Sequence, residues 1–180
     1  MMNNSAETAE KGRGLNFEDY ISDENSFSAR IPSDWEKNED IIFGRQVKEY
    51  GVDLRGPANK EGAYVAVSAT YFGSDHEVFK THEKYIAANL KSSNQAMGEK
   101  TGKVRTIAVA GRTASQFDRN TFISAPLHSV DAKRVKIFQR KIVVPAKKGF
   151  YVLTYQAPMD LAKKYLKIFD AVLNSFKPRF

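Results

Sequence analysis

The C-terminal segment carries the strongest structural pattern in the sequence, which is that of an amphipathic helix. After Pro158, apolar residues recur at steps of three and four, and lysines occupy positions between them. The apolar positions are Leu161, Tyr165, Ile168, Val172 and Phe176, widened by Phe169 and Leu173. Such a stripe has to pack on another apolar surface. The sequence therefore predicts a helix over residues 159–176 that lies on a sheet.

Alternating apolar and polar residues predict the strands of that sheet. The clearest run is 64–72, which has small or apolar residues on both faces and therefore suggests a central strand. Further strands are expected at 27–31, 104–110, 112–123, 134–144 and 150–155, with one or two bent strands over 40–52. The apolar positions of 134–144 change phase between Ile137 and Phe138, which predicts a β-bulge. Glycine, proline and asparagine predict a loop over 51–62.

A second helix is expected over residues 75–91. Ser74 precedes Glu77 by three residues, the spacing of a capping box. Phe79, His82, Ile86 and Leu90 then follow at helical spacing and predict the face that packs on the sheet.

The two ends of the chain differ in their capacity to form a core. Residues 1–14 hold no large apolar residue except the two opening methionines, so we expect a flexible tail there and one domain over 15–180. Trp35 follows the turn at Pro32 and is the predicted structural anchor against the core.

Composition excludes several classes of chemistry. The chain has no cysteine, so disulfides, thiolate nucleophiles and zinc–thiolate sites are absent. There is no apolar run long enough to span a bilayer, and we expect a soluble chain. The net charge of +7 is uneven: residues 1–100 carry 12 Lys+Arg against 17 Asp+Glu, whereas residues 101–180 carry 16 against 4. The second half is therefore strongly basic.

Catalytic and cofactor signatures are missing from the sequence. It contains no Gly-x-Ser-x-Gly turn, no phosphate-binding Gly-x-x-x-x-Gly-Lys loop and no Gly-x-Gly-x-x-Gly. Asp75, His76 and Glu77 form the one cluster with the composition of a metal site, but consecutive residues point in different directions. We therefore assign no catalytic, cofactor-binding or metal-ligating residue and expect no cofactor.

The strongest candidate for a binding surface is basic. It consists of Arg134, Lys136, Arg140 and Lys141, with Phe138 among them. Basic residues interleaved with aromatics are typical of nucleic-acid surfaces. A regular strand would place the first three on one face, whereas the expected bulge would break up that row. The alternative interpretation is a solvated strand with Phe138 in the core.

Two segments of the chain resemble the PsbP-like family, which is named for an extrinsic subunit of photosystem II. They are Phe27–Trp35, with its Pro-x-x-Trp sequence, and the ending formed by Tyr151–Pro158, the predicted helix and Ser175–Pro178. The order and spacing of elements agree over about residues 17–178. The resemblance implies an α+β fold, an α/β/α sandwich with a mostly antiparallel sheet. It also implies relatives that are commonly exported from bacteria.

The sequence favours a non-enzymatic binding or accessory module that engages a protein partner. One alternative is a nucleic-acid or anionic-surface binder that uses the basic half, for which weak non-specific polyanion binding is expected. Another is an enzyme whose site is assembled from scattered residues. If a leader precedes the chain, the resemblance implies an extracytoplasmic location in a bacterium.

Overall fold

The computed structural model describes residues 15–91 and 97–180. Residues 1–14, where the sequence predicts a flexible tail, lie outside the described residues, and so do residues 92–96. No helix in the described ranges is both long and apolar enough to cross a membrane.

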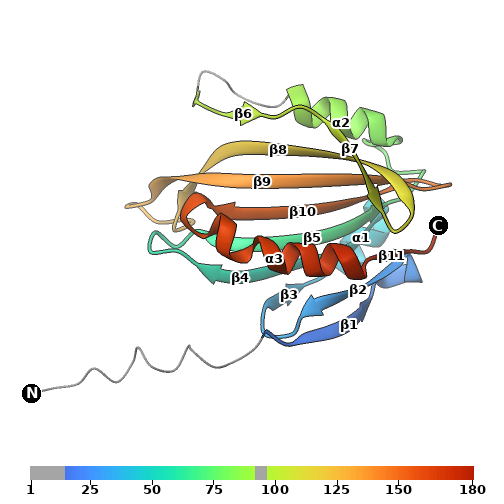
Figure 1. Ribbon diagram of the computed structural model, residues 1–180, viewed down its shortest axis with the longest axis horizontal. Coiled ribbons are helices and arrows are strands. Elements are labelled where there is room, and N and C mark those ends of the chain that lie inside the picture. Colours follow the sequence, from blue (N-terminus) through green and yellow to red (C-terminus); the bar gives the residue numbers. More distant parts are fainter. Residues whose placement is uncertain (1–14, 92–96) are drawn as a thin grey trace, which may run out of the picture.

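The centre of the molecule is a large antiparallel sheet (Figure 1). Its strands follow the order β3-β4-β5-β10-β9-β8-β6, and β7 pairs with β8. Their bounds are β3 Glu36–Asn38, β4 Glu49–Ala58, β5 Tyr64–Phe72, β6 Lys100–Thr101, β7 Arg105–Val109, β8 Arg112–Ala125, β9 Lys133–Pro145 and β10 Phe150–Pro158. The C-terminal strand β10 therefore lies at the centre, between β5 and β9.

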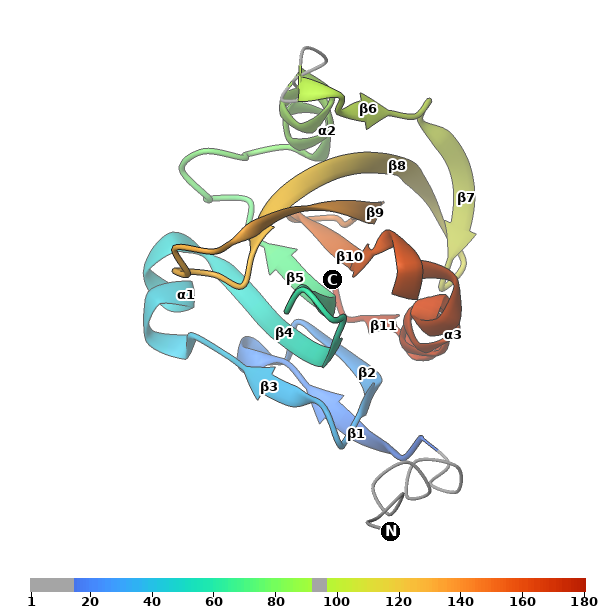
Figure 2. The ribbon, with the colours of Figure 1, turned by 90° about the vertical axis from the view of Figure 1, so that its left-hand side faces the viewer.

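Within residues 15–91 and 97–180, a small sheet and three α-helices complete the fold. The small sheet has the order β1-β2-β11, from Phe17–Ile21, Phe27–Pro32 and Lys177–Pro178, and a short 3-10 helix spans Asp23–Asn25. The helices are α1 (Ile41–Val47), α2 (His82–Lys91) and α3 (Met159–Ser175). Figure 2 shows the large sheet curving around the side on which α3 lies, with α1 and α2 away from that side.

The main core lies between α3, the small sheet and one face of the large sheet. Alternate side chains of β5 and β10, such as Val67 and Leu153, lie on this face. They pack there with Phe169 of α3 and Phe27 of β2. A second cluster on the other face joins Phe72, Phe117 and Phe150 to Tyr85 of α2. The α/β/α layering and the amphipathic C-terminal helix expected from the sequence are thereby confirmed.

Three local predictions are wrong. Residues 41–47 form helix α1 instead of a strand, because Asp40 caps the segment. Strand β4 continues through Ala58 into the expected loop, with a register shift between Arg55 and Ala58. Helix α2 begins at His82, not at residue 75, since His76 holds the preceding turn through its own hydrogen bonds.

The expected β-bulge in β9 is also wrong. The strand keeps an unbroken register with both neighbours across Ile137 and Phe138. The change of phase has a different cause: Ile137 packs in a small cluster on one face, while Phe138 packs against the main core on the other. Both faces of β9 are partly apolar, so two regular stripes resemble one interrupted stripe in the sequence.

Candidate functional site

Helix α1 is short, and it is capped at both ends. The Asp40 side chain accepts a hydrogen bond from the Phe43 amide over 3.1 Å, and Lys48 ends the helix in the left-handed region at φ 64°. Gly44 lies so close to β4 that a Cβ at this position would clash with the Glu49 carbonyl oxygen. Glycine thus lets α1 pack directly on the backbone of β4.

The packing of α1 leaves large apolar side chains in solvent. Gly44 is its one buried residue, whereas Ile42 is 78% exposed and Phe43 55% exposed. Val78, in the turn before α2, is 67% exposed. We call Ile41, Ile42, Phe43 and Val78 the α1 patch. Large apolar side chains that lie exposed near one another commonly mark an interaction surface.

A groove of about 280 Å³ opens between α1 and the turn before α2. Phe43 and Val47 form one wall, and Val78 and Phe79 form the other, with His76 and Glu49 also lining it. This volume is slightly below the roughly 300–1,000 Å³ typical of small-molecule sites. The groove is therefore of a size for individual apolar side chains.

The wall formed by Val78 and Phe79 is fixed by buried His76. Its Nδ1 accepts hydrogen bonds from the amides of Val78 (3.2 Å) and Phe79 (2.9 Å). The ring proton therefore resides on Nε2, which donates to Glu49 Oε1 over 2.8 Å. Both ring nitrogens therefore have structural partners, and His76 positions the turn.

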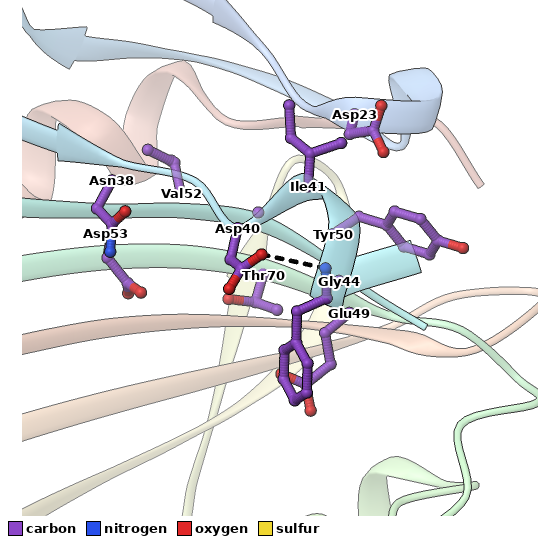
Figure 3. A pocket seen from close by; sticks show the side chains of 12 residues that line it. Asp23, Asn38, Asp40, Ile41, Gly44, Glu49, Tyr50, Val52, Asp53 and Thr70 are labelled. Atoms are coloured by element: carbon purple, nitrogen blue, oxygen red, sulfur yellow. Dashed lines mark hydrogen bonds between the residues drawn. The ribbon is translucent and has the colours of Figure 1, made fainter. Parts of the chain in front are cut away.

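A second pocket, of about 230 Å³, shares Phe43 and Glu49 with the groove and is acidic (Figure 3). Asp40, Glu49 and Asp53 line it together with Thr70, and Figure 3 shows Asp23 at its far side, beyond Ile41. Packing around the carboxylate raises the pKa of Asp53, and the charge of Glu49 raises it further, although much of the residue is exposed. A positive group placed here would offset this repulsion.

The structure divides the predicted basic surface between two faces. Arg134, Lys136 and Arg140 alternate along β9 on the face that also carries Tyr155, and Lys141 lies on the opposite face. Arg140 is paired with Asp118 through two bonds of 2.8 and 2.9 Å. The same carboxylate also accepts from Arg105.

The remaining basic residues differ in their surroundings. The guanidinium of Arg134 lies 3.7 Å from the centre of the Phe122 ring and donates to the Met97 carbonyl. Lys136 is exposed. Two of the three basic side chains on this face are thus already engaged within the chain.

Lys141 packs against α2 on the opposite face, where its Nζ lies 3.0 Å from the Tyr85 hydroxyl. Burial, together with the positive charge of Arg119, lowers the pKa of Lys141 from 10.5 to about 8. The folded state therefore disfavours protonation relative to the unfolded chain. The stability contribution of Lys141 should rise as pH increases from about 8 towards 10.5.

We predict that Lys141→Met stabilises the protein at pH 7 by on the order of 1 kcal/mol, after discounting for the lost bond to Tyr85. The advantage over the parent should shrink as pH rises from 8 to 10. Urea unfolding of both proteins across this range measures it. A difference that stays constant with pH would contradict the lowered pKa.

The three residues of the Asp75–Glu77 cluster differ in their exposure. His76 is buried, whereas Asp75 and Glu77 are exposed. Over residues 15–91 and 97–180, there is no group of three or more His, Cys, Asp or Glu residues that could hold a metal ion.

Sequence reasoning missed the α1 patch. It assigned Ile41, Ile42 and Phe43 to a strand and so directed part of them towards the core. The available signals were Asp40, an N-cap residue three positions before Phe43, and Gly44, which marks close approach of the backbone. Neither signal indicates that the apolar side chains face solvent.

Comparison with known proteins supports the fold. No protein-family profile and no curated protein sequence matches the chain. Among solved structures, a Pseudomonas aeruginosa protein of unknown function, PA94, aligns with a TM-score of 0.54 and 13% identity, covering 91% of this chain and 98% of its own. Cyanobacterial PsbP from Synechocystis sp. PCC 6803 aligns with a TM-score of 0.54 and 12% identity, over 94% and 96% of the two chains. The chain thus has a PsbP-like fold, as the sequence resemblance implied.

A third solved structure is more distant. LpqN of Mycobacterium tuberculosis, which is involved in cell envelope biogenesis, aligns with a TM-score of 0.45 and 13% identity, covering 92% of this chain and 91% of its own.

Proposed function

We propose that this chain is a non-enzymatic binding module that engages a protein partner through the α1 patch. The observation that carries the proposal is the exposure of Ile42, Phe43 and Val78 beside a groove whose walls are apolar. Burying such side chains is the main favourable term in most protein association. The His76 hydrogen bonds hold one wall in place before a partner arrives, which lowers the entropic cost of binding.

The nucleic-acid alternative has weaker support. Arg140 is neutralised by Asp118, and Lys141 lies on the other face of β9. An enzymatic role that uses His76 also has weaker support, because both of its ring nitrogens already have hydrogen-bond partners. The extracytoplasmic location implied by the resemblance stays a prediction, which fractionation of the native organism would test.

A matched pair of surface variants tests the proposal. We expect the tagged protein to retain a specific protein from an extract of the native organism. Phe43→Ser with Val78→Ser should weaken that retention at least about tenfold, because large apolar side chains at the centre of an interface dominate its affinity.

The control is Leu127→Ser with Val130→Ser, which removes two exposed apolar residues from the β8–β9 connection. This variant should retain the partner as the parent does, and both variants should melt like the parent. Equal loss of retention from both pairs, or from neither, would contradict a role for the α1 patch.

A further inference from the structure

The groove and the acidic pocket form one continuous surface around Phe43. Both are lined by Phe43 and Glu49, so they meet at these two residues. Their lining residues include five carboxylates and neither lysine nor arginine: Asp23, Asp40, Glu49, Asp53 and Glu77. This negative surface belongs to a chain whose net charge is +7.

The five carboxylates are not equally available to a partner. Asp23 accepts two bonds of 2.8 Å from Arg45, and Glu49 accepts from His76. Asp40, Asp53 and Glu77 are exposed, and none of them forms an ion pair within the described residues. Asp40 and Asp53 thus line the acidic pocket and Glu77 lines the groove, and no ion pair among the described residues neutralises them.

This combination selects the chemistry of what can dock there. An apolar segment bearing acidic residues would bring like charges together at the rim. An apolar segment bearing lysine or arginine would place its large side chains between Phe43 and Val78 and its cations near Asp40, Asp53 and Glu77. The two volumes, about 280 and 230 Å³, are each of a size for such side chains.

We infer that the occupant of the α1 patch is a positively charged, amphipathic segment of the partner protein, an inference that rests on the proposed function. Apolar side chains enter the groove, and a lysine or arginine reaches the acidic pocket across Phe43. Recognition of this kind combines hydrophobic anchoring with charge complementarity.

Three synthetic peptides serve as probes. The first is an amphipathic helix of leucine and lysine, the second has glutamate in place of lysine, and the third has serine in place of leucine. Fluorescence anisotropy measures binding of each at physiological salt. We expect only the leucine–lysine peptide to bind with measurable affinity. Its affinity should fall as the salt concentration rises. The net positive charge of the protein would favour the glutamate peptide if attraction were non-specific.

Charge-neutral variants locate the effect. Asp40→Asn, Asp53→Asn and Glu77→Gln together keep the N-cap of α1 and should weaken binding of the leucine–lysine peptide about tenfold in total. The control removes the same number of charges elsewhere, as Asp34→Asn, Asp131→Asn and Asp170→Asn, all of which are exposed. The control should bind like the parent.

The outcomes distinguish this inference from the proposed function. Equal binding of the lysine and glutamate peptides, or equal weakening by both charge variants, would overturn the inference. If retention of the native partner depends on Phe43 and Val78 but not on the three carboxylates, the proposed function holds and the inference is wrong. If the Phe43 and Val78 variant retains the partner normally, the proposed function itself is wrong.

Discussion

Replacement of Trp35 by alanine is expected to lower the free energy of unfolding by about 3–5 kcal/mol. Trp35 is only 7% exposed, and its ring packs edge-on against Tyr165 of α3 with 6.3 Å between ring centres. Loss of the indole would leave a cavity between α3 and the start of β3, which the fixed backbone on either side cannot fill. Chemical unfolding followed by circular dichroism measures the change.

A double-mutant cycle with Gly56 shows whether the indole acts through this packing. A Cβ at Gly56 would lie 2.6 Å from Cε2 and Cζ2 of Trp35. Gly56→Ala alone should therefore destabilise the protein by about 1–3 kcal/mol through overpacking. In the Trp35→Ala background the same change should cost far less, because the space is empty. Additive effects of the two substitutions would show that the ring does not occupy this position.

The elements that the sequence predicted well are long and strongly periodic. Helix α3 repeats its apolar stripe over 17 residues, and β5 alternates without exception from Val65 to Tyr71. Each has one environment along its length, which is the condition under which periodicity reports burial. Trp35 could likewise be placed in the core from its position after a strand-ending proline.

The predictions that failed concern elements that are short or whose residues pack in two different surroundings. Helix α1 has seven residues, and its three consecutive apolar side chains fit neither a helical stripe nor a single strand face. The start of α2 was misplaced because Ser74 and Glu77 match a capping box, whereas the turn is held by His76 and its bond to Glu49. That partner is 27 residues away in the sequence, so local spacing cannot reveal it.

The candidate site was missed for a related reason. Sequence patterns identify apolar side chains but not which of them lack a covering element. Ile42 and Phe43 could have been core residues in a strand, and their exposure depends on α1 packing through Gly44. For the basic residues, the sequence identified the charges but not Asp118, which neutralises Arg140 from the neighbouring strand.

Removal of residues 159–180 is expected to unfold or aggregate the protein. These residues contribute buried Ile168, Phe169, Val172 and Phe176, which cover the face of the sheet formed by β5 and β10. At roughly 1.5–3 kcal/mol for each buried apolar side chain, their loss approaches the whole stability of a typical domain, about 5–15 kcal/mol.

The truncation also removes hydrogen bonds to groups in the core. The hydroxyl of fully buried Tyr151 accepts from the amides of Arg179 and Phe180, and the Tyr155 hydroxyl donates to the Ala162 carbonyl over 2.7 Å. Both tyrosines would lose these partners, which adds a polar cost to the exposed apolar face.

Two comparisons separate packing of α3 from the mere presence of a C-terminal helix. Phe169→Ala should cost about 3–5 kcal/mol, whereas Lys167→Ala, on the exposed side, should change stability by less than about 0.5 kcal/mol.

Deleting residues 1–14, the predicted tail, should leave the melting temperature nearly unchanged. Thermal melts of the four variants decide the matter. Equal destabilisation by the two truncations would show that the N-terminal residues belong to the folded unit, and equal effects of the two point substitutions would show that α3 does not pack on the sheet through Phe169.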